Sequence, residues 1–134
     1  MPVSLEDAFQ FLYGEGERVL GWEGAPDELV RLAERAFPGK PYCLVRKWAV
    51  VDVTGPEDEM AALSSEGLLR KVLLAHEVVM DSRNRFPAGY WVRSNFGISY
   101  DHPCVFETGS TLYLLLGDGC RKQASLDTVF SLRP

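Results

Sequence analysis

Apolar positions recur at helical spacing in two segments near the beginning of the chain. The first segment follows Ser4, a residue suited to capping a helix, and aligns four apolar residues on one stripe. The second follows Pro26, which is favoured in the first turn of a helix, and aligns five apolar residues on one face. The pattern therefore predicts a helix over residues 4–12 and a second helix over residues 26–37.

The spacing changes from helical to extended after the second helix. Residues 42–53 are dominated by β-favouring side chains and predict a strand. Residues 57–59 are acidic and fit either a solvated turn or the start of a helix. Residues 68–80 combine helical spacing with valine-rich character, so a helix or turn as far as Lys71 is expected to give way to a strand over residues 73–81.

The C-terminal third predicts a β-meander. Three extended runs are joined by Gly109-Ser110 and by Gly117-Asp118-Gly119. Gly109 suits the positive-φ position of a two-residue type II′ turn, which would place Phe106 opposite Tyr113. We therefore expect three adjacent antiparallel strands, over residues 104–108, 111–116 and 120–123.

These elements predict an α+β fold in a single domain over residues 1–134. A further short strand is expected over residues 90–94, and residues 125–130 fit either a final helix or an edge strand. The expected architecture is two N-terminal helices packed on an antiparallel sheet or small half-barrel that ends in the meander. No apolar run has the roughly 20 residues needed to span a bilayer, and the N-terminus does not have the pattern of a signal peptide, so we expect a cytoplasmic protein without membrane contact.

The charges are divided unevenly along the chain. Residues 1–67 carry 13 acidic and 6 basic side chains, whereas residues 68–134 carry 6 acidic and 8 basic ones. The acidic excess excludes general attraction to a phosphate backbone but permits an acidic docking face for a basic partner. Within that excess, the run formed by Glu57, Asp58 and Glu59 is the candidate docking segment, although such runs are usually solvated surface.

Basic and aromatic side chains alternate between residues 83 and 93. The candidate binding residues in this segment are Arg83, Arg85, Tyr90, Trp91 and Arg93. Such residues can grip phosphates and stack bases, and they are enriched at protein–protein hot spots. The plainer interpretation, a hairpin with a core tryptophan and solvated arginines, is the more common one.

One short segment brings together an acid, an imidazole and a thiol: Asp101, His102 and Cys104. A Cys–His pair can generate a thiolate nucleophile. A loop histidine that precedes a buried cysteine is the far commoner arrangement. The three cysteines are odd in number and have no metal-ligand spacing, so we expect reduced thiols, no bound metal and no cofactor.

The last 60 or so residues resemble an uncharacterised family of small bacterial proteins of unknown function. The similarity lies in Arg85-Phe86, Gly89 to Arg93, Phe106 to Thr108 and Thr111 to Gly117, and extends to Arg121-Lys122. The resemblance implies no activity, cofactor or site residue.

The sequence favours a non-catalytic protein that binds another macromolecule, most readily a small inhibitor or regulator of another protein. Phage-borne inhibitors and toxin-neutralising proteins are of this kind by analogy only. Two alternatives stay open: a hydrolase-like or other enzyme with a Cys/His site in a β-lined pocket, and a nucleic-acid-binding module that uses the arginines. Either a monomer or a homodimer is compatible with the sequence.

Overall fold

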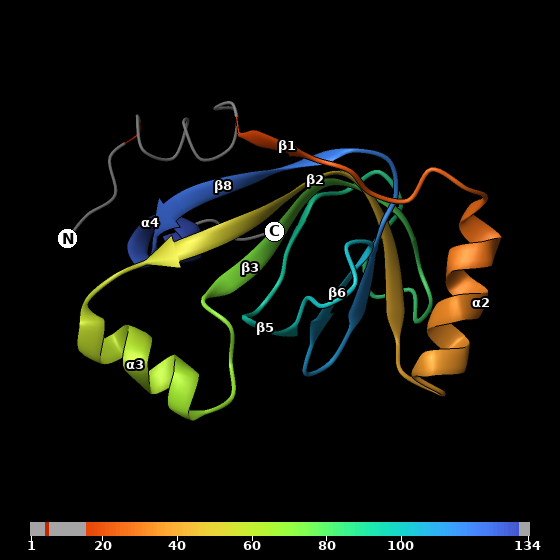
Figure 1. Ribbon diagram of the computed structural model, residues 1–134. Helices are drawn as coiled ribbons and strands as arrows, with labels where there is room; N and C mark the ends of the chain where they lie inside the picture. Colours follow the sequence, from red (N-terminus) through yellow and green to blue (C-terminus); the bar gives the residue numbers. More distant parts are fainter. Residues whose placement is uncertain (1–4, 6–15, 132–134) are drawn as a thin grey trace.

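The computed structural model describes Leu5 and residues 16–131 (Figure 1). The helix expected over residues 4–12 lies, apart from Leu5, outside the described residues. The described strands are β1 (Glu17–Val19), β2 (Tyr42–Thr54), β3 (Lys71–Asp81), β4 (Val92–Arg93), β5 (Gly97–Ser99), β6 (Val105–Thr108), β7 (Leu112–Leu115) and β8 (Gly119–Ser125). The described helices of more than one residue are α2 (Pro26–Ala36), α3 (Glu57–Ser65) and α4 (Leu126–Ser131).

Helix α2 confirms the prediction for the second helical segment. Pro26 occupies its first turn together with Asp27 and Glu28, whose carboxylates are favourable near the positive end of the helix dipole. The expected arrangement of two N-terminal helices packed on the sheet is not matched in the described residues. Of that pair, the structure describes α2, and the other two helices come later in the chain. Helix α3 lies between β2 and β3, where the acidic run begins it, and α4 follows the last strand.

The strands form one curled, open sheet, the half-barrel form of the expected fold (Figure 1). The sheet is mixed rather than antiparallel, because β2 pairs with β3 in antiparallel fashion on one edge and with β7 and β8 in parallel fashion on the other. Strand β2 is thus the central strand. β6 and β5 extend the sheet beyond β7, β1 extends it beyond β8, and β4 borders β3.

The first hairpin of the expected meander is present, but its turn has a different geometry. Phe106 lies opposite Tyr113, as predicted. The amide of Thr108 donates to the carbonyl of Thr111 at 2.9 Å, and the Thr108 hydroxyl accepts from the Thr111 amide at 3.1 Å. The backbone of Gly109 does not adopt a positive φ, so the type II′ assignment was wrong. The paired threonines close this turn without special glycine geometry.

The second predicted hairpin is absent from the described sheet, because β2 provides the partner for both β7 and β8. Tyr42 to Val45 pair with β7, and Ala49 to Thr54 pair with β8. The segment Gly117-Asp118-Gly119 therefore joins two strands that run in the same direction, and it is a bend rather than a hairpin loop. Gly117 has φ of 67° there, and Lys47 on the facing part of β2 has φ of 53°. The two strands bend at the same level, where the sheet curls.

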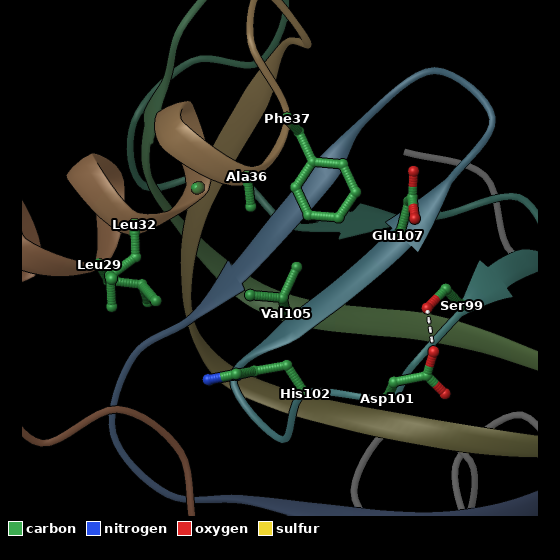
Figure 2. A pocket seen from close by; sticks show the side chains of 10 residues that line it. Leu29, Leu32, Ala36, Phe37, Ser99, Asp101, His102, Val105 and Glu107 are labelled. Atoms are coloured by element: carbon green, nitrogen blue, oxygen red, sulfur yellow. Dashed lines mark hydrogen bonds between the residues drawn. The ribbon is translucent and has the colours of Figure 1, made fainter.

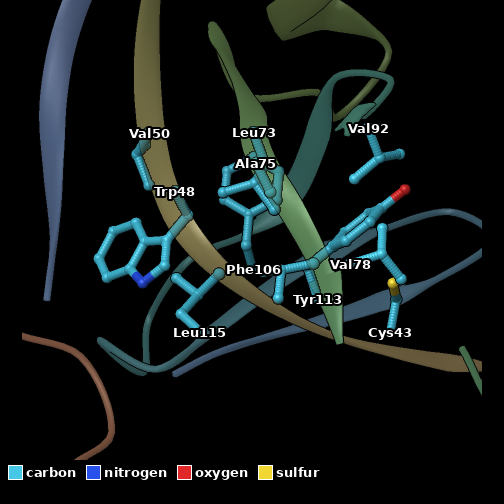
Figure 3. Packing of buried hydrophobic residues seen from close by; sticks show 11 residues of the cluster. Cys43, Trp48, Val50, Leu73, Ala75, Val78, Val92, Phe106, Tyr113 and Leu115 are labelled. Atoms are coloured by element: carbon cyan, nitrogen blue, oxygen red, sulfur yellow. The ribbon is translucent and has the colours of Figure 1, made fainter. Parts of the chain in front are cut away.

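Buried side chains line both faces of the curled sheet. The inner face holds the largest cluster, in which Trp48, Phe106 and Tyr113 pack with aliphatic residues of β2, β3 and β7 (Figure 3). On the outer face, α2 covers one end through Leu29 and Ala33, and α4 covers the other through Val129. Within residues 16–131, none of the helices has the length and apolar character needed to cross a membrane.

The backbone near the bend packs directly against an indole ring. The Trp48 Nε1 donates to the carbonyl of Gly117 at 3.2 Å. A Cβ atom added to Gly119 would lie 2.2 to 2.5 Å from three ring atoms of Trp48, well inside van der Waals contact. Glycine at position 119 is therefore required by this close approach.

Candidate functional site

A pocket of about 330 Å³ lies between α2 and the outward surface of β5 and β6 (Figure 2). Its size is at the lower end of the range for ligand pockets, roughly 300–1,000 Å³. Most of its lining is apolar, and polar groups are contributed by the β5 and β6 side. The lining residues are Leu29, Leu32, Ala33, Ala36, Phe37, Ser99, Asp101, His102, Val105 and Glu107.

Helix α2 creates the pocket because its apolar face is wider than the surface that it covers. Leu29 and Ala33 are buried against the β7 side chains Leu112 and Leu114. Leu32 projects to the side of this contact and is 43% exposed. The outward faces of β5 and β6 next to α2 are left without a helix of their own among the described residues. The result is an apolar hollow at the helix–sheet boundary.

A partly buried ion pair lies at one side of the pocket. Lys40 Nζ donates to Glu107 Oε2 at 2.6 Å and to the carbonyl of Thr108 at 2.7 Å. The two side chains are 18% and 14% exposed, so this pair is better shielded from water than most surface ion pairs. It ties the segment that follows α2 to β6 and thereby fixes the width of the pocket.

The loop that precedes β6 contributes the remaining polar groups. His102 Nδ1 accepts a hydrogen bond from the backbone amide of Cys104 at 3.1 Å. A neutral imidazole that accepts at Nδ1 carries its hydrogen on Nε2, so the outer nitrogen is a donor. The Ser99 hydroxyl donates to Asp101 Oδ2 at 3.1 Å, at the end of the pocket (Figure 2).

The Cys104 thiol is not arranged as a nucleophile. Its side chain is buried with Leu29, Leu44 and Leu112, and burial raises the pKa of the thiol. The imidazole of His102 is engaged with the Cys104 amide, whereas activation would require it to take the thiol proton. The geometry therefore gives no support to a Cys–His catalytic pair. All three cysteines are free in the structure.

We expect the thiols to differ strongly in their reactivity with iodoacetamide. Burial, together with the charge of Asp81, raises the pKa of Cys43 to about 12, and Cys104 is also buried. Cys120 is only partly buried and should be alkylated first in the folded protein. Mass spectrometry of peptides after timed alkylation measures this order, with urea-unfolded protein as the control. Faster labelling of Cys104 than of Cys120 would contradict it.

Arg85, the second arginine of the basic–aromatic segment, belongs to a partly buried network. Arg85 donates to Asp81 through Nε at 3.0 Å and through Nη2 at 2.7 Å, and its Nη1 donates to the Thr111 hydroxyl at 2.9 Å. The Asp81 side chain is 0% exposed and that of Arg85 is 31% exposed. Arg85 therefore compensates a buried carboxylate and is not an open phosphate-binding group.

The structure does not bring the other members of this segment to Arg85. Arg93 pairs with Leu74 on β3 and stacks over Phe130 at 4.4 Å, whereas Asp81 lies seven residues further along that strand, about 23 Å away at the usual rise of a strand. Arg83 donates to the carbonyl of Gly39 at 3.3 Å. The expected single surface of arginines and aromatic rings is thus divided between two ends of the sheet.

The two aromatic candidates also separate. Trp91 packs against the buried cluster under α4, whereas Tyr90 is 64% exposed.

At the other end of the molecule from α2, the acidic residues Glu57, Asp58 and Glu59 form the exposed first turn of α3 (Figure 1). Glu57 forms an ion pair with Arg70 at 3.3 Å. Among the described residues, no group of three or more His, Cys, Asp or Glu side chains has metal-site geometry.

Sequence reasoning identified only part of the pocket. It singled out Asp101 and His102, but it assigned Leu32 and Phe37 to a helix face that would simply be covered by the sheet. It also gave no role to Glu107. One signal was available: five of the six apolar residues between positions 29 and 37 form a stripe broader than one strand pair can bury.

The comparisons with known proteins give a family but no function. No curated protein and no solved structure matches the chain. A family model described as "Domain of unknown function (DUF6957)" matches residues 20–131. The match includes every element from α2 to α4, and with them the whole pocket. The chain therefore belongs to the DUF6957 family, an uncharacterised family, as the resemblance of its C-terminal half indicated.

Proposed function

We propose that this protein is a non-catalytic binding protein, acting as a small inhibitor or regulator, that docks another protein at the pocket beside α2. The observation that carries this proposal is the apolar pocket wall, in which Leu32 stays 43% exposed beside the buried residues Leu29 and Ala33. An exposed apolar hollow rimmed by polar groups is typical of a site that receives a side chain from a partner.

The size and lining of the pocket favour one large side chain as the occupant. Its volume of about 330 Å³ is small for an extended ligand. The apolar part of the wall comes from α2 and Val105, so transfer of an apolar group out of water supplies the binding energy. Ser99 and His102 at the rim offer hydrogen-bonding groups to the main chain on either side of the inserted side chain.

The two alternative functions have less support. The Cys104 thiol is buried and its pKa is raised, so it does not provide the activated nucleophile that the enzyme hypothesis requires. Arg85 is paired with Asp81, and Arg93 lies at the far end of β3. These arginines therefore do not form the continuous basic surface that binding of a nucleic acid would require.

Filling the pocket is expected to abolish binding of peptides selected against the wild-type surface. A random-peptide display library selected on the wild-type protein should yield clones that share a large apolar residue. Those clones should bind the variant Ala36→Trp at least tenfold more weakly, because the new indole occupies the volume that Ala36 leaves open. Affinities are measured by biolayer interferometry with synthetic copies of the selected peptides.

The matched control is Ala61→Trp. Ala61 is also an exposed helical alanine, but it lies on α3, away from the pocket. It controls for a general effect of an added surface tryptophan, and thermal melting of both variants controls for folding. Selected peptides that bind the Ala36→Trp variant as well as they bind the wild type would exclude the pocket as the docking site.

A further inference from the structure

We infer that the side chain received by the pocket is followed in the partner protein by a lysine or arginine, which pairs with Asp101. This inference rests on the proposed function and adds the charge of the recognised segment to it. It comes from the ionisable groups around the pocket and from the way in which each is already engaged.

Among the described Asp, Glu, Lys and Arg residues, only acidic ones line the pocket. Its ionisable lining residues are Asp101, His102 and Glu107, and none of the described residues lining it is lysine or arginine. A cationic group that approaches the rim therefore meets carboxylates, whereas an anionic group meets like charge.

The two carboxylates differ in what they can offer a partner. Glu107 already forms a shielded ion pair with Lys40 at 2.6 Å, so its charge is compensated within the protein. Asp101 accepts a hydrogen bond from the neutral hydroxyl of Ser99, and within the described part of the chain it forms no ion pair. Its negative charge is the one left for a cation at the rim.

The placement of Asp101 matches a residue next to the inserted side chain rather than the inserted side chain itself. Asp101 is exposed and lies at the β5–β6 end of the pocket, while the apolar wall is on the α2 side (Figure 2). An apolar group seated against Leu32 and Ala36 would leave its neighbouring residue facing this rim. Lysine and arginine have apolar stems that can lie along the pocket edge while the charged end reaches the carboxylate.

The strength expected of this contact is modest, because the carboxylate is exposed. Exposed ion pairs change affinity by a small factor that falls with added salt. We therefore expect a preference of about two- to fivefold for a cationic neighbour at low ionic strength, disappearing near 0.5 M salt. The apolar contact supplies most of the affinity, and Asp101 supplies selectivity.

The test uses three capped tripeptides, each with a tryptophan followed by two lysines, two glutamines or two glutamates. Each is titrated into the ¹⁵N-labelled wild-type protein, and dissociation constants are taken from the shifts of the Ala33 and Val105 amide signals. We expect the lysine peptide to bind most tightly and the glutamate peptide most weakly. In Asp101→Asn this order should collapse to equal affinities. In Asp58→Asn, a matched change on the exposed turn of α3, it should persist.

The outcomes separate this inference from the proposed function. Equal binding of all three peptides at the pocket of the wild-type protein would overturn the inference and leave apolar docking intact. A lysine preference that survives in Asp101→Asn would also overturn it, since another group would then select the cation. If none of the peptides shifts the pocket signals, docking of an apolar side chain there is itself wrong.

Discussion

Replacing Asp81 by alanine is expected to lower the free energy of unfolding by about 3 kcal/mol. The Asp81 carboxylate is fully buried and accepts three hydrogen bonds from Arg85, from its backbone amide at 2.7 Å and from two guanidinium nitrogens. Its removal leaves the arginine charge without a carboxylate to compensate it, next to the buried residues Cys43 and Tyr113. The loss falls at the lower end of the range for broken buried pairs, because Arg85 is 31% exposed and can turn toward water. Urea unfolding followed by circular dichroism measures it.

Two further variants identify the cause of this loss. Asp81→Ala combined with Arg85→Met should be more stable than Asp81→Ala alone, because the uncompensated charge is then gone. Asp58→Ala removes an exposed carboxylate from α3 and should change stability by less than about 0.5 kcal/mol. If the double variant were no more stable than Asp81→Ala, packing rather than charge would be the source.

The contribution of Asp81 should also depend on pH in a defined direction. Burial alone would raise the pKa of this carboxyl, but the hydrogen bonds and charge of Arg85 outweigh burial and hold the pKa below its usual value. A depressed folded-state pKa gives stability that is present above the unfolded pKa, about 3.9, and is lost as the pH falls through the folded value. The stability difference between the wild type and Asp81→Ala should therefore be constant near neutral pH and shrink below about pH 4. A difference that grows on acidification would contradict this assignment.

Gly119→Ala is expected to destabilise the protein by about 3 kcal/mol, the upper part of the range for overpacking. The added methyl group would lie 2.2 Å from one Trp48 ring atom and within 2.5 Å of two more. Trp48 is 1% exposed and its Nε1 is hydrogen-bonded to Gly117, so the indole has little room to move away. Thermal and urea unfolding should both show the loss.

Gly109→Ala is the matched control, because it adds the same methyl group in the turn between β6 and β7. A Cβ atom at Gly109 would meet no atom within 4 Å, and the backbone there does not have a positive φ. Stability should stay the same or rise by a few tenths of a kcal/mol as the unfolded chain loses freedom. Similar losses for the two variants would show that contact with Trp48 is not the reason for glycine at position 119.

The parts of the fold that local pattern predicted are those in which local interactions decide the structure. Helix α2 follows from its proline start and apolar spacing, and the register of Phe106 with Tyr113 follows from the length of a two-residue turn. Turn residues do not specify the direction of the chain after them. Gly117 and Gly119 therefore suggested a hairpin. In the structure, Gly117 adopts a positive φ at a bend, and Gly119 allows the backbone to lie against the Trp48 ring. That requirement arises from a residue about 70 positions earlier.

The site was less accessible from sequence, because burial decides what each charged residue does. Arg85 and Arg93 look equivalent in the chain, yet one neutralises a buried aspartate and the other covers Phe130. The pocket is a consequence of how far α2 extends over the sheet. Leu32 and Glu107 belong to different elements, and nothing in their local sequence places them on the same cavity.

The position of β2 at the centre of the sheet also constrains how the chain is made. Its pairings with β7 and β8 join residues about 70 apart in sequence. Both halves of this edge of β2 therefore stay unpaired until the C-terminal strands have been synthesised. During synthesis, the backbone donors and acceptors on that edge have no strand to pair with until β7 and then β8, residues 112–125, have left the ribosome. Pairings of such long range slow folding and leave a valine-rich edge available to other chains. Pairing of β2 with β7 and β8, rather than formation of α2 or of the antiparallel β2–β3 pair, is then the step at which aggregation competes with folding.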